Sequence, residues 1–286
     1  NMNINTSEKN TNYAIDVIEP YIFNSNMNFI YGVDYKNKDL SSSSYYKLDS
    51  LNFKSGVKYE LAYNINHTAL LEYDIQDYYI TDNSLVASSI SKYSGANAEI
   101  VLKNIISKNT LNSYIHPTDG RLLYYENLLS PVTNSDNGYM KNFISFKQVD
   151  QFNKNILTSK FSIGNIVSLQ NSTIKNNSKF SLGGYKLRGF DSYGAGPRDS
   201  DSYIGGNNIV SASIEAIRPL NKFSDNPIYF TLFSDAGKVW GNKDSPSNNE
   251  QSIRASYGTG LKFLSPVGPI SLTWAFPLSE EKYDKK

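Results

Sequence analysis

The chain has 286 residues and a formal net charge of +1, from 28 basic and 27 acidic residues, and it is 39% hydrophobic and 13% aromatic. This balanced charge gives no general attraction to nucleic acid, so no nucleic-acid partner is expected. Two His and no Cys argue against a zinc site, a disulfide framework and a thiol nucleophile, and we expect neither a metal nor another cofactor. No apolar run approaches the about 18 residues of a membrane helix.

Apolar and polar residues alternate along many stretches of the chain, which predicts β-strands with one apolar and one polar face. The alternation covers residues 29–35, 53–61, 69–76, 253–263 and 270–276. We expect strands of about 9–12 residues, which is long for a globular sheet and typical of a tilted membrane crossing. At about 22 residues per strand and turn, the chain holds about thirteen strands.

Two all-β architectures fit this alternation: a transmembrane β-barrel with lipid-facing apolar side chains, and a soluble β-sandwich with buried ones. Aromatic residues such as Tyr78, Tyr79 and Trp240 lie near strand ends, and Asn, Ser and Asp cluster between strands. Both features favour an antiparallel transmembrane β-barrel. Bacterial barrels have even strand numbers and an open edge cannot face lipid, so we interpret both ends of the sequence as cuts in a longer protein.

Four stretches in the last third of the chain are the most distinctive parts of the sequence for identifying a protein family. They are LGGYKLRGFDSYGAGPRD (182–199), GGNNIVSASIEAIRPL (205–220), FTLFSDAGKVW (230–240) and SIRASYGTGLKFLSPVGPISLTWAFPL (252–278). In this order they resemble the Omp85 superfamily, and most closely the barrel domain of its alphaproteobacterial outer-membrane assembly factors. The resemblance implies that residues 1–286 form part of a sixteen-stranded barrel, from roughly the third strand to the fifteenth, without the POTRA domains, the first strands or the closing strand.

The resemblance also implies a function. The protein would be integral to the outer membrane of a Gram-negative bacterium and would insert β-barrel proteins there without enzymatic catalysis. The implied partners are unfolded outer-membrane protein clients, accessory lipoproteins of the assembly complex and outer-membrane lipid, and a strand edge of the barrel would pair with the client. Two alternatives remain: a two-partner-type secretion pore of the same superfamily, and a passive porin that passes ions steadily.

A candidate site follows from the alternation. Glu215 and Asp235 lie on neighbouring strands, each opposite the apolar face. If the apolar faces meet lipid, both carboxylates point into the lumen and need a cation. We expect the loop 181–204 to fold inward and to place the guanidinium of Arg188 against both acids, and the resemblance implies the same contact. The motif residues expected to shape this region are Gly183, Gly184, Gly189, Phe190, Gly196, Pro197, Gly205, Gly206 and Gly237.

Other interpretations of these residues are open to test. Arg188 could lie on an exposed loop and contact only water. The glycines could form a phosphate cradle, although the Walker spacing is missing. Glu215 and Asp235 could act as an acid–base pair in glycoside hydrolysis, although a nearby arginine would hold both ionised. Asp235 to Gly237 could form a hairpin turn, although alternation that continues to Trp240 favours a strand.

Overall fold

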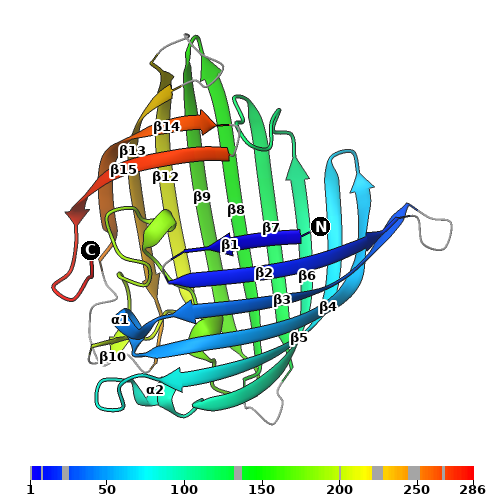
Figure 1. Cartoon of the computed structure of the whole chain (residues 1–286), viewed down its shortest axis with the longest axis vertical. Helices are drawn as coiled ribbons and strands as arrows, with labels where there is room; N and C mark the ends of the chain where they lie inside the picture. The colour runs from blue at the N-terminus through cyan, green and yellow to red at the C-terminus, as the bar shows by residue number, and fades with distance from the viewer. Residues whose placement is uncertain are drawn as a thin grey trace.

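The computed structural model describes residues 2–7, 9–20, 26–131, 137–199, 201–220, 228–243, 252–265 and 268–286. These residues form one sheet of thirteen antiparallel strands, in which each strand pairs with the next one along the chain (Figure 1). The strands are β1 (Met2–Thr6), β2 (Asn10–Glu19), β3 (Met27–Asp39), β4 (Tyr46–Ala62), β5 (Ile65–Ile80), β6 (Gly95–Asn109), β7 (Gly120–Ser130), β8 (Tyr139–Phe152), β9 (Asn155–Ser168), β12 (Asn208–Pro219), β13 (Ile228–Trp240), β14 (Arg254–Ser265) and β15 (Gly268–Ser279).

Smaller elements lie in the connections between these strands. Two short α-helices, α1 (Ser41–Ser44) and α2 (Ser88–Ser91), follow β3 and β5. The connection from β9 to β12 contains the 3-10 turns η2 (Asn176–Ser178) and η3 (Gly184–Lys186) and a two-stranded ribbon of β10 (Arg198–Asp199) and β11 (Ser202–Tyr203). No helix within the described ranges is long and apolar enough to cross a membrane.

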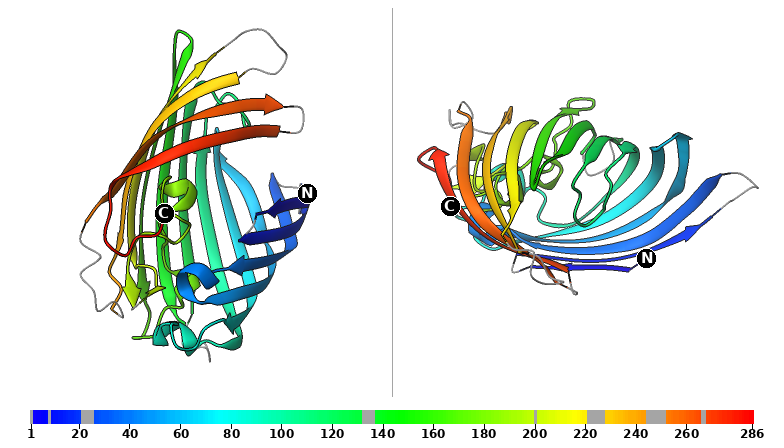
Figure 2. Two further views of the ribbon diagram at one scale, coloured as in Figure 1. Left: turned by 60° about the vertical axis from the view of Figure 1, so that its left-hand side comes forward. Right: turned by 90° about the horizontal axis from the view of Figure 1, so that it is seen from above.

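The sheet curves into an open barrel, as both views in Figure 2 show. Within the described residues β1 and β15 are its two edge strands. The expected fold class, an antiparallel barrel of about thirteen strands, is therefore confirmed. The expected strand length is wrong for several strands, because β4 has 17 residues and β5 has 16. These strands continue past the outward apolar stretch to residues such as Tyr46 and Tyr78, which are buried together with Ile90 of α2.

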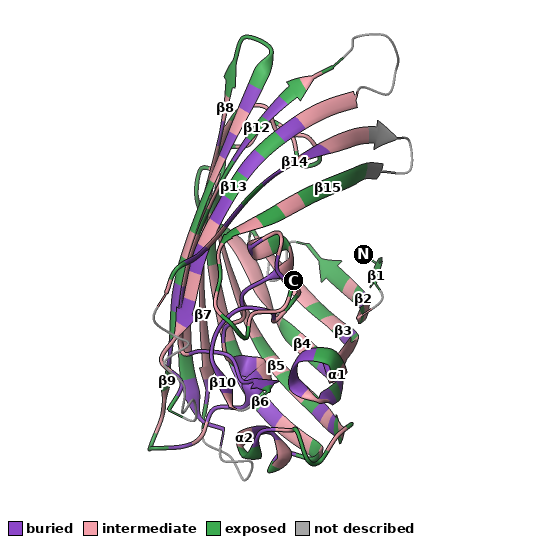
Figure 3. Ribbon diagram, turned by 90° about the vertical axis from the view of Figure 1, so that its left-hand side faces the viewer, coloured by how far each residue is buried: buried purple, intermediate pink, exposed green. Residues whose placement is uncertain are grey.

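Side chains alternate between the convex outer face and the concave face, which we call the lumen face. On the outer face, Val33, Phe53 and Tyr73 are aligned across β3, β4 and β5, and all three are exposed. On the lumen face, Lys54 forms an ion pair with Asp34 at 3.1 Å. Figure 3 shows the resulting alternation of exposure along the strands. Apolar side chains outside and charge pairs inside are typical of a lipid-facing barrel and the reverse of a soluble sandwich.

The shortest described turns and the longest connection lie at opposite ends of the barrel. At one end, two residues join β4 to β5, and two residues join β8 to β9. At the other end lie α1, α2 and the connection 169–207, which we call the lumen segment (Figure 1). In bacterial outer-membrane barrels the short turns are periplasmic and the long loops extracellular.

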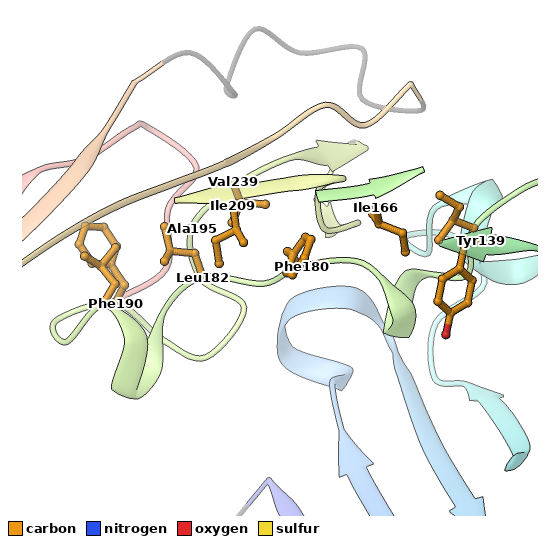
Figure 4. Packing of buried hydrophobic residues seen from close by; sticks show 10 residues of the cluster. Tyr139, Ile166, Phe180, Leu182, Phe190, Ala195, Ile209 and Val239 are labelled. Carbon is orange, nitrogen blue, oxygen red and sulfur yellow. The ribbon is translucent and has the colours of Figure 1, made fainter. Parts of the chain in front are cut away.

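The lumen segment lies against the concave side of the sheet (Figures 1 and 2). Its apolar residues pack on lumen-facing residues of β8, β9, β12 and β13, and Figure 4 shows this cluster from close by. Leu182 and Leu187 are almost fully buried in it, as are Ile209 of β12 and Val239 of β13. Burial of a side chain of this size stabilises a fold by about 1.5–3 kcal/mol, so the cluster fixes the path of the segment on both sides of Arg188. The whole cluster consists of Tyr139, Ile166, Ile174, Phe180, Leu182, Leu187, Phe190, Ala195, Ile209 and Val239.

Candidate functional site

The structure brings Arg188, Glu215 and Asp235 together, and we call these three residues the Arg188 cluster. Arg188 follows η3, and its guanidinium Nε and Nη2 donate to Asp235 at 2.7 and 2.8 Å, while Nη1 donates to Glu215 at 2.9 Å. The backbone N–H of Arg188 also donates to Asp235, at 3.1 Å. The side chain of Asp235 is 1% exposed and that of Arg188 is 22% exposed. Two parallel hydrogen bonds from a guanidinium to a carboxylate fix the orientation of the arginine side chain and also neutralise the buried negative charge.

Strand alternation places these side chains. Glu215 of β12 and Asp235 of β13 face the lumen, whereas the neighbouring Ile214 and Leu232 face outward and are exposed. Burial alone would lower the pKa of Arg188, but hydrogen bonds and charge from Asp235 and Glu215 outweigh it and raise the pKa above its usual range. The arginine is therefore a permanent cation in this cluster.

Three further residues contact the Arg188 cluster, and the sequence alone does not single them out as site residues. The Arg188 guanidinium carbon lies 3.5 Å from the ring centroid of Phe233, and Nη2 donates to the hydroxyl of Ser213 at 3.3 Å. Lys262 of β14 donates to Glu215 at 2.7 Å, so this carboxylate lies between two cations. Phe233 and Ser213 share the lumen face with the two acids, a signal that was present in the alternation.

The glycine-rich motif shapes the backbone that presents Arg188. At Gly183, which has a φ of +114°, a Cβ would overlap the carbonyl oxygen of Asp191. At Gly237 in β13, a Cβ would lie 3.0 Å from Leu182, so the segment packs directly on the backbone of the wall. This placement confirms that Asp235 to Gly237 lie in a strand and not in a turn. Of the other motif residues, Gly184, Gly189, Gly196 and Gly205 also have positive φ, Gly206 closely approaches β13, and Phe190 and Pro197 are buried.

A second ion pair holds the lumen segment to the opposite part of the sheet. Lys175, whose side chain is 0% exposed, lies with its Nζ 3.8 Å from Glu99 of β6. Asn137 links the two residues, because its side-chain oxygen accepts from the Lys175 backbone N–H at 2.8 Å and its amide donates to Glu99. Burial lowers the pKa of Lys175 despite the nearby charge of Glu99. The backbone oxygen of Tyr203 adds a further contact by accepting from the hydroxyl of Ser44 in α1 at 2.8 Å.

The residues after β15 also contact the lumen segment. Two backbone hydrogen bonds join them, from Asp191 N–H to the Lys285 oxygen at 2.9 Å and from Lys285 N–H to the Gly194 oxygen at 3.0 Å. Arg254 at the start of β14 forms an ion pair with Asp284 at 3.0 Å, and both side chains are almost completely buried. The edge strand β15 is therefore tied to the lumen segment through residues 280–286.

The arrangement supports a conformational role more readily than catalysis. Both carboxylates of the Arg188 cluster are engaged by basic side chains, so neither is free to approach a substrate as an acid or a base. The lumen segment continues into β12 and not into a helix, unlike the loop of a phosphate-binding P-loop. Within the described ranges no group of His, Cys, Asp or Glu could hold a metal ion.

Comparisons with known proteins agree with this fold. A sequence model described as the Omp85 superfamily domain matches residues 1–286. The outer membrane protein assembly factor BamA of Neorickettsia risticii (strain Illinois) is 24% identical over 281 residues, which are 96% of this chain and 38% of that protein. The sorting assembly machinery 50 kDa subunit of Saccharomyces cerevisiae is 26% identical over 177 residues, 59% of this chain and 37% of that protein.

Among solved structures, BamA from Haemophilus ducreyi lacking POTRA domains 1-3 superimposes with a TM-score of 0.82 at 22% identity, covering 99% of this chain and 62% of that one. This likeness shows the barrel fold. The chain spans well under half the length of the two curated relatives.

Proposed function

The chain belongs to the Omp85 superfamily, and from this premise we propose that it is the barrel part of an outer-membrane insertase, which assembles and inserts β-barrel proteins. The observation that carries the proposal is the match of 96% of this chain to a protein named as an outer membrane protein assembly factor. The yeast relative is likewise named as part of a sorting and assembly machinery. Neither a secretion pore nor a passive porin gains similar support.

The geometry supports this proposal over a porin. A passive porin needs a water-filled channel, whereas here the lumen segment is anchored inside the barrel by the Arg188 cluster and by Lys175. We propose that the Arg188 cluster holds this segment in one position while the barrel works on its client. The role needs no enzymatic chemistry and no cofactor.

The proposed mechanism uses strand pairing. In lipid, a sheet edge must have every backbone donor and acceptor paired. The edges of the described sheet are β1 and β15, and a further segment of the protein or a client strand would satisfy them. A client that adds its strand to such an edge gains main-chain hydrogen bonds before it is released into the bilayer.

The proposed location and partners follow from the same premise. The outward apolar face and the family place the protein as an integral component of an outer membrane. We propose that the protein lies in the outer membrane of a Gram-negative bacterium, where lipid surrounds the barrel. Its proposed partners are unfolded outer-membrane proteins as clients and accessory lipoproteins of the assembly complex.

Reconstitution tests this proposal. The full-length protein that contains this segment is placed in liposomes, and the folding of a urea-unfolded β-barrel client is followed by its resistance to protease. We expect faster client folding than in empty liposomes, and slower folding for the variant Arg188→Ala. Steady ion conductance without any acceleration of client folding would contradict the proposal and indicate a porin.

A further inference from the structure

Two lysines of the lumen face stand directly opposite each other. Lys147 of β8 and Lys160 of β9 are a cross-strand pair, and Lys160 is in turn aligned with Ser213 of β12. Both lysines share the lumen face with the buried residues Val149 and Ile166 of their own strands. Like charges directly opposite on one sheet face destabilise the pairing. Their placement therefore calls for a negative partner.

Two other lysines of the lumen face have such partners. Lys54 lies 2.7 Å from Asp16 and 3.1 Å from Asp34. Lys103 lies 3.5 Å from Glu72, and also approaches Glu126 of β7.

The Lys147–Lys160 pair differs from Lys54 and Lys103, because two cations stand opposite each other there. Among the described residues, no carboxylate lies within ion-pair distance of either lysine. The carboxylates nearest to them in the sheet, Glu215 and Asp235, are already occupied by Arg188 and Lys262.

Lys160 borders a cavity of about 460 Å³ between the lumen segment and the wall formed by β8, β9, β12, β14 and β15. One water needs about 10–15 Å³ of cavity volume on this measure, so there is room for a small anion together with water. Four basic residues line the cavity, and two of them, Arg188 and Lys262, are balanced by Asp235 and Glu215. The other two, Lys160 and Lys186, have no carboxylate within ion-pair distance among the described residues and leave an excess of positive charge. The lining also presents hydroxyl groups, from Ser145, Ser162, Ser211, Ser213, Ser271 and Thr273.

We propose that this cavity binds a phosphate group, with Lys160 as its principal cation and Lys147 in support. Lysine is a point-charge ligand for phosphate, and serine hydroxyls donate to its oxygens. An excess of positive charge matches a doubly charged anion better than a single carboxylate. The site uses side chains of the barrel wall, unlike the backbone cradle of a P-loop, and the inference does not depend on the proposed function.

The test measures binding of inorganic phosphate to the full-length protein in detergent micelles by isothermal titration calorimetry, with chloride keeping the ionic strength constant. We expect saturable binding to the parent protein. Loss of one charge-assisted contact, in Lys160→Gln, should weaken the binding at least about tenfold. Lys103→Gln removes a lumen lysine that lies between two carboxylates and should leave phosphate binding unchanged.

A second variant guards against misfolding of the first. Lys160→Glu converts the opposed pair into one of opposite charge, so it should abolish phosphate binding while raising the unfolding temperature in phosphate-free buffer. Absence of saturable binding to the parent, or equal affinity in the parent and a folded Lys160→Gln variant, would overturn the proposal.

A second arm identifies the source of the phosphate group. The same titration is repeated in lipid nanodiscs that contain phosphatidic acid, with phosphatidylcholine nanodiscs as the comparison. Free phosphate binding that is blocked only by phosphatidic acid assigns the site to a lipid headgroup. Binding that is equal in both nanodiscs assigns it to a soluble phosphate.

Discussion

The guanidinium of Arg188 lies over the ring of Phe233, with 3.5 Å between the guanidinium carbon and the ring centroid. The same group donates to Asp235 through Nε and Nη2. One planar cation thus satisfies a buried carboxylate at its edge and an aromatic ring at its face, which a lysine cannot do in the same way.

Substitution of Arg188 should therefore release the lumen segment. Removing one partner of a buried ion pair typically costs about 3–5 kcal/mol, so Arg188→Ala should increase proteolysis of the segment 181–204. Arg188→Lys keeps the charge but loses the fork and the stacking, and it should behave more like the alanine variant than like the parent. The exposed Arg121 of β7 provides the control Arg121→Ala. Equal cleavage of the segment in all four proteins would contradict the proposed role of the cluster.

Substitutions at Gly95 and Gly183 distinguish the cost of backbone strain from the cost of steric overlap. Gly183 has a φ of +114° and a Cβ there would overlap Asp191, whereas Gly95 has a φ of +85° and open space around it. Gly95→Ala should cost about 1–2 kcal/mol from the left-handed backbone alone, and Gly183→Ala should add about 1–3 kcal/mol for overpacking. Urea unfolding of the two variants measures the difference. Equal losses would show that the loop yields at Gly183 without resistance.

Because Lys175 and Glu99 form a buried pair, we expect their substitutions to have non-additive effects on the free energy of unfolding. Lys175→Met leaves Glu99 without its cation and should cost about 3–5 kcal/mol. Combining it with Glu99→Gln removes both charges, and the one side-chain oxygen of the glutamine can still accept from Gln76 or Asn137. The double variant should recover most of that loss, as buried ion pairs replaced by neutral groups commonly do. Unfolding free energies of the two single variants and the double variant provide the cycle, and simple additivity would argue against direct pairing.

His116, in the connection between β6 and β7, predicts a pH dependence. Its ring lies 4.7 Å from that of Tyr229, and burial together with the charge of Lys262 lowers its pKa. Because the folded state disfavours the protonated imidazole, stability should fall as the pH drops below about 6.5 towards the lower pKa of the folded state. His116→Gln should lose less stability than the parent between about pH 7.5 and pH 5. Parallel pH curves for both proteins would contradict this assignment.

The sequence predicts much of the fold because the strand period is local. Alternation in residues 209–217 and 230–240 is enough to place Glu215 and Asp235 on the face opposite Ile214 and Leu232. The same alternation places Phe233 on that face, but it does not identify the ring as a partner of the arginine.

Other contacts could not be predicted, because they depend on distance in space. Lys262 reaches Glu215 only because the sheet curves and a long side chain crosses an intervening strand. Lys175 and Glu99 are far apart in the chain, and no periodicity relates a loop residue to a strand. The extra length of β4 and β5 likewise reflects the packing of their ends against α2. The apolar alternation of the lipid-facing part gives no information about this packing.

The hydrogen bonds of Lys285 with Asp191 and Gly194, together with the Arg254–Asp284 pair, have a mechanical consequence. Residues 280–286 connect β15 of the described sheet to the lumen segment. Any displacement of β15 would therefore be transmitted to the chain three to six residues after Arg188, and withdrawal of the lumen segment would remove contacts that hold residues 280–286 in place.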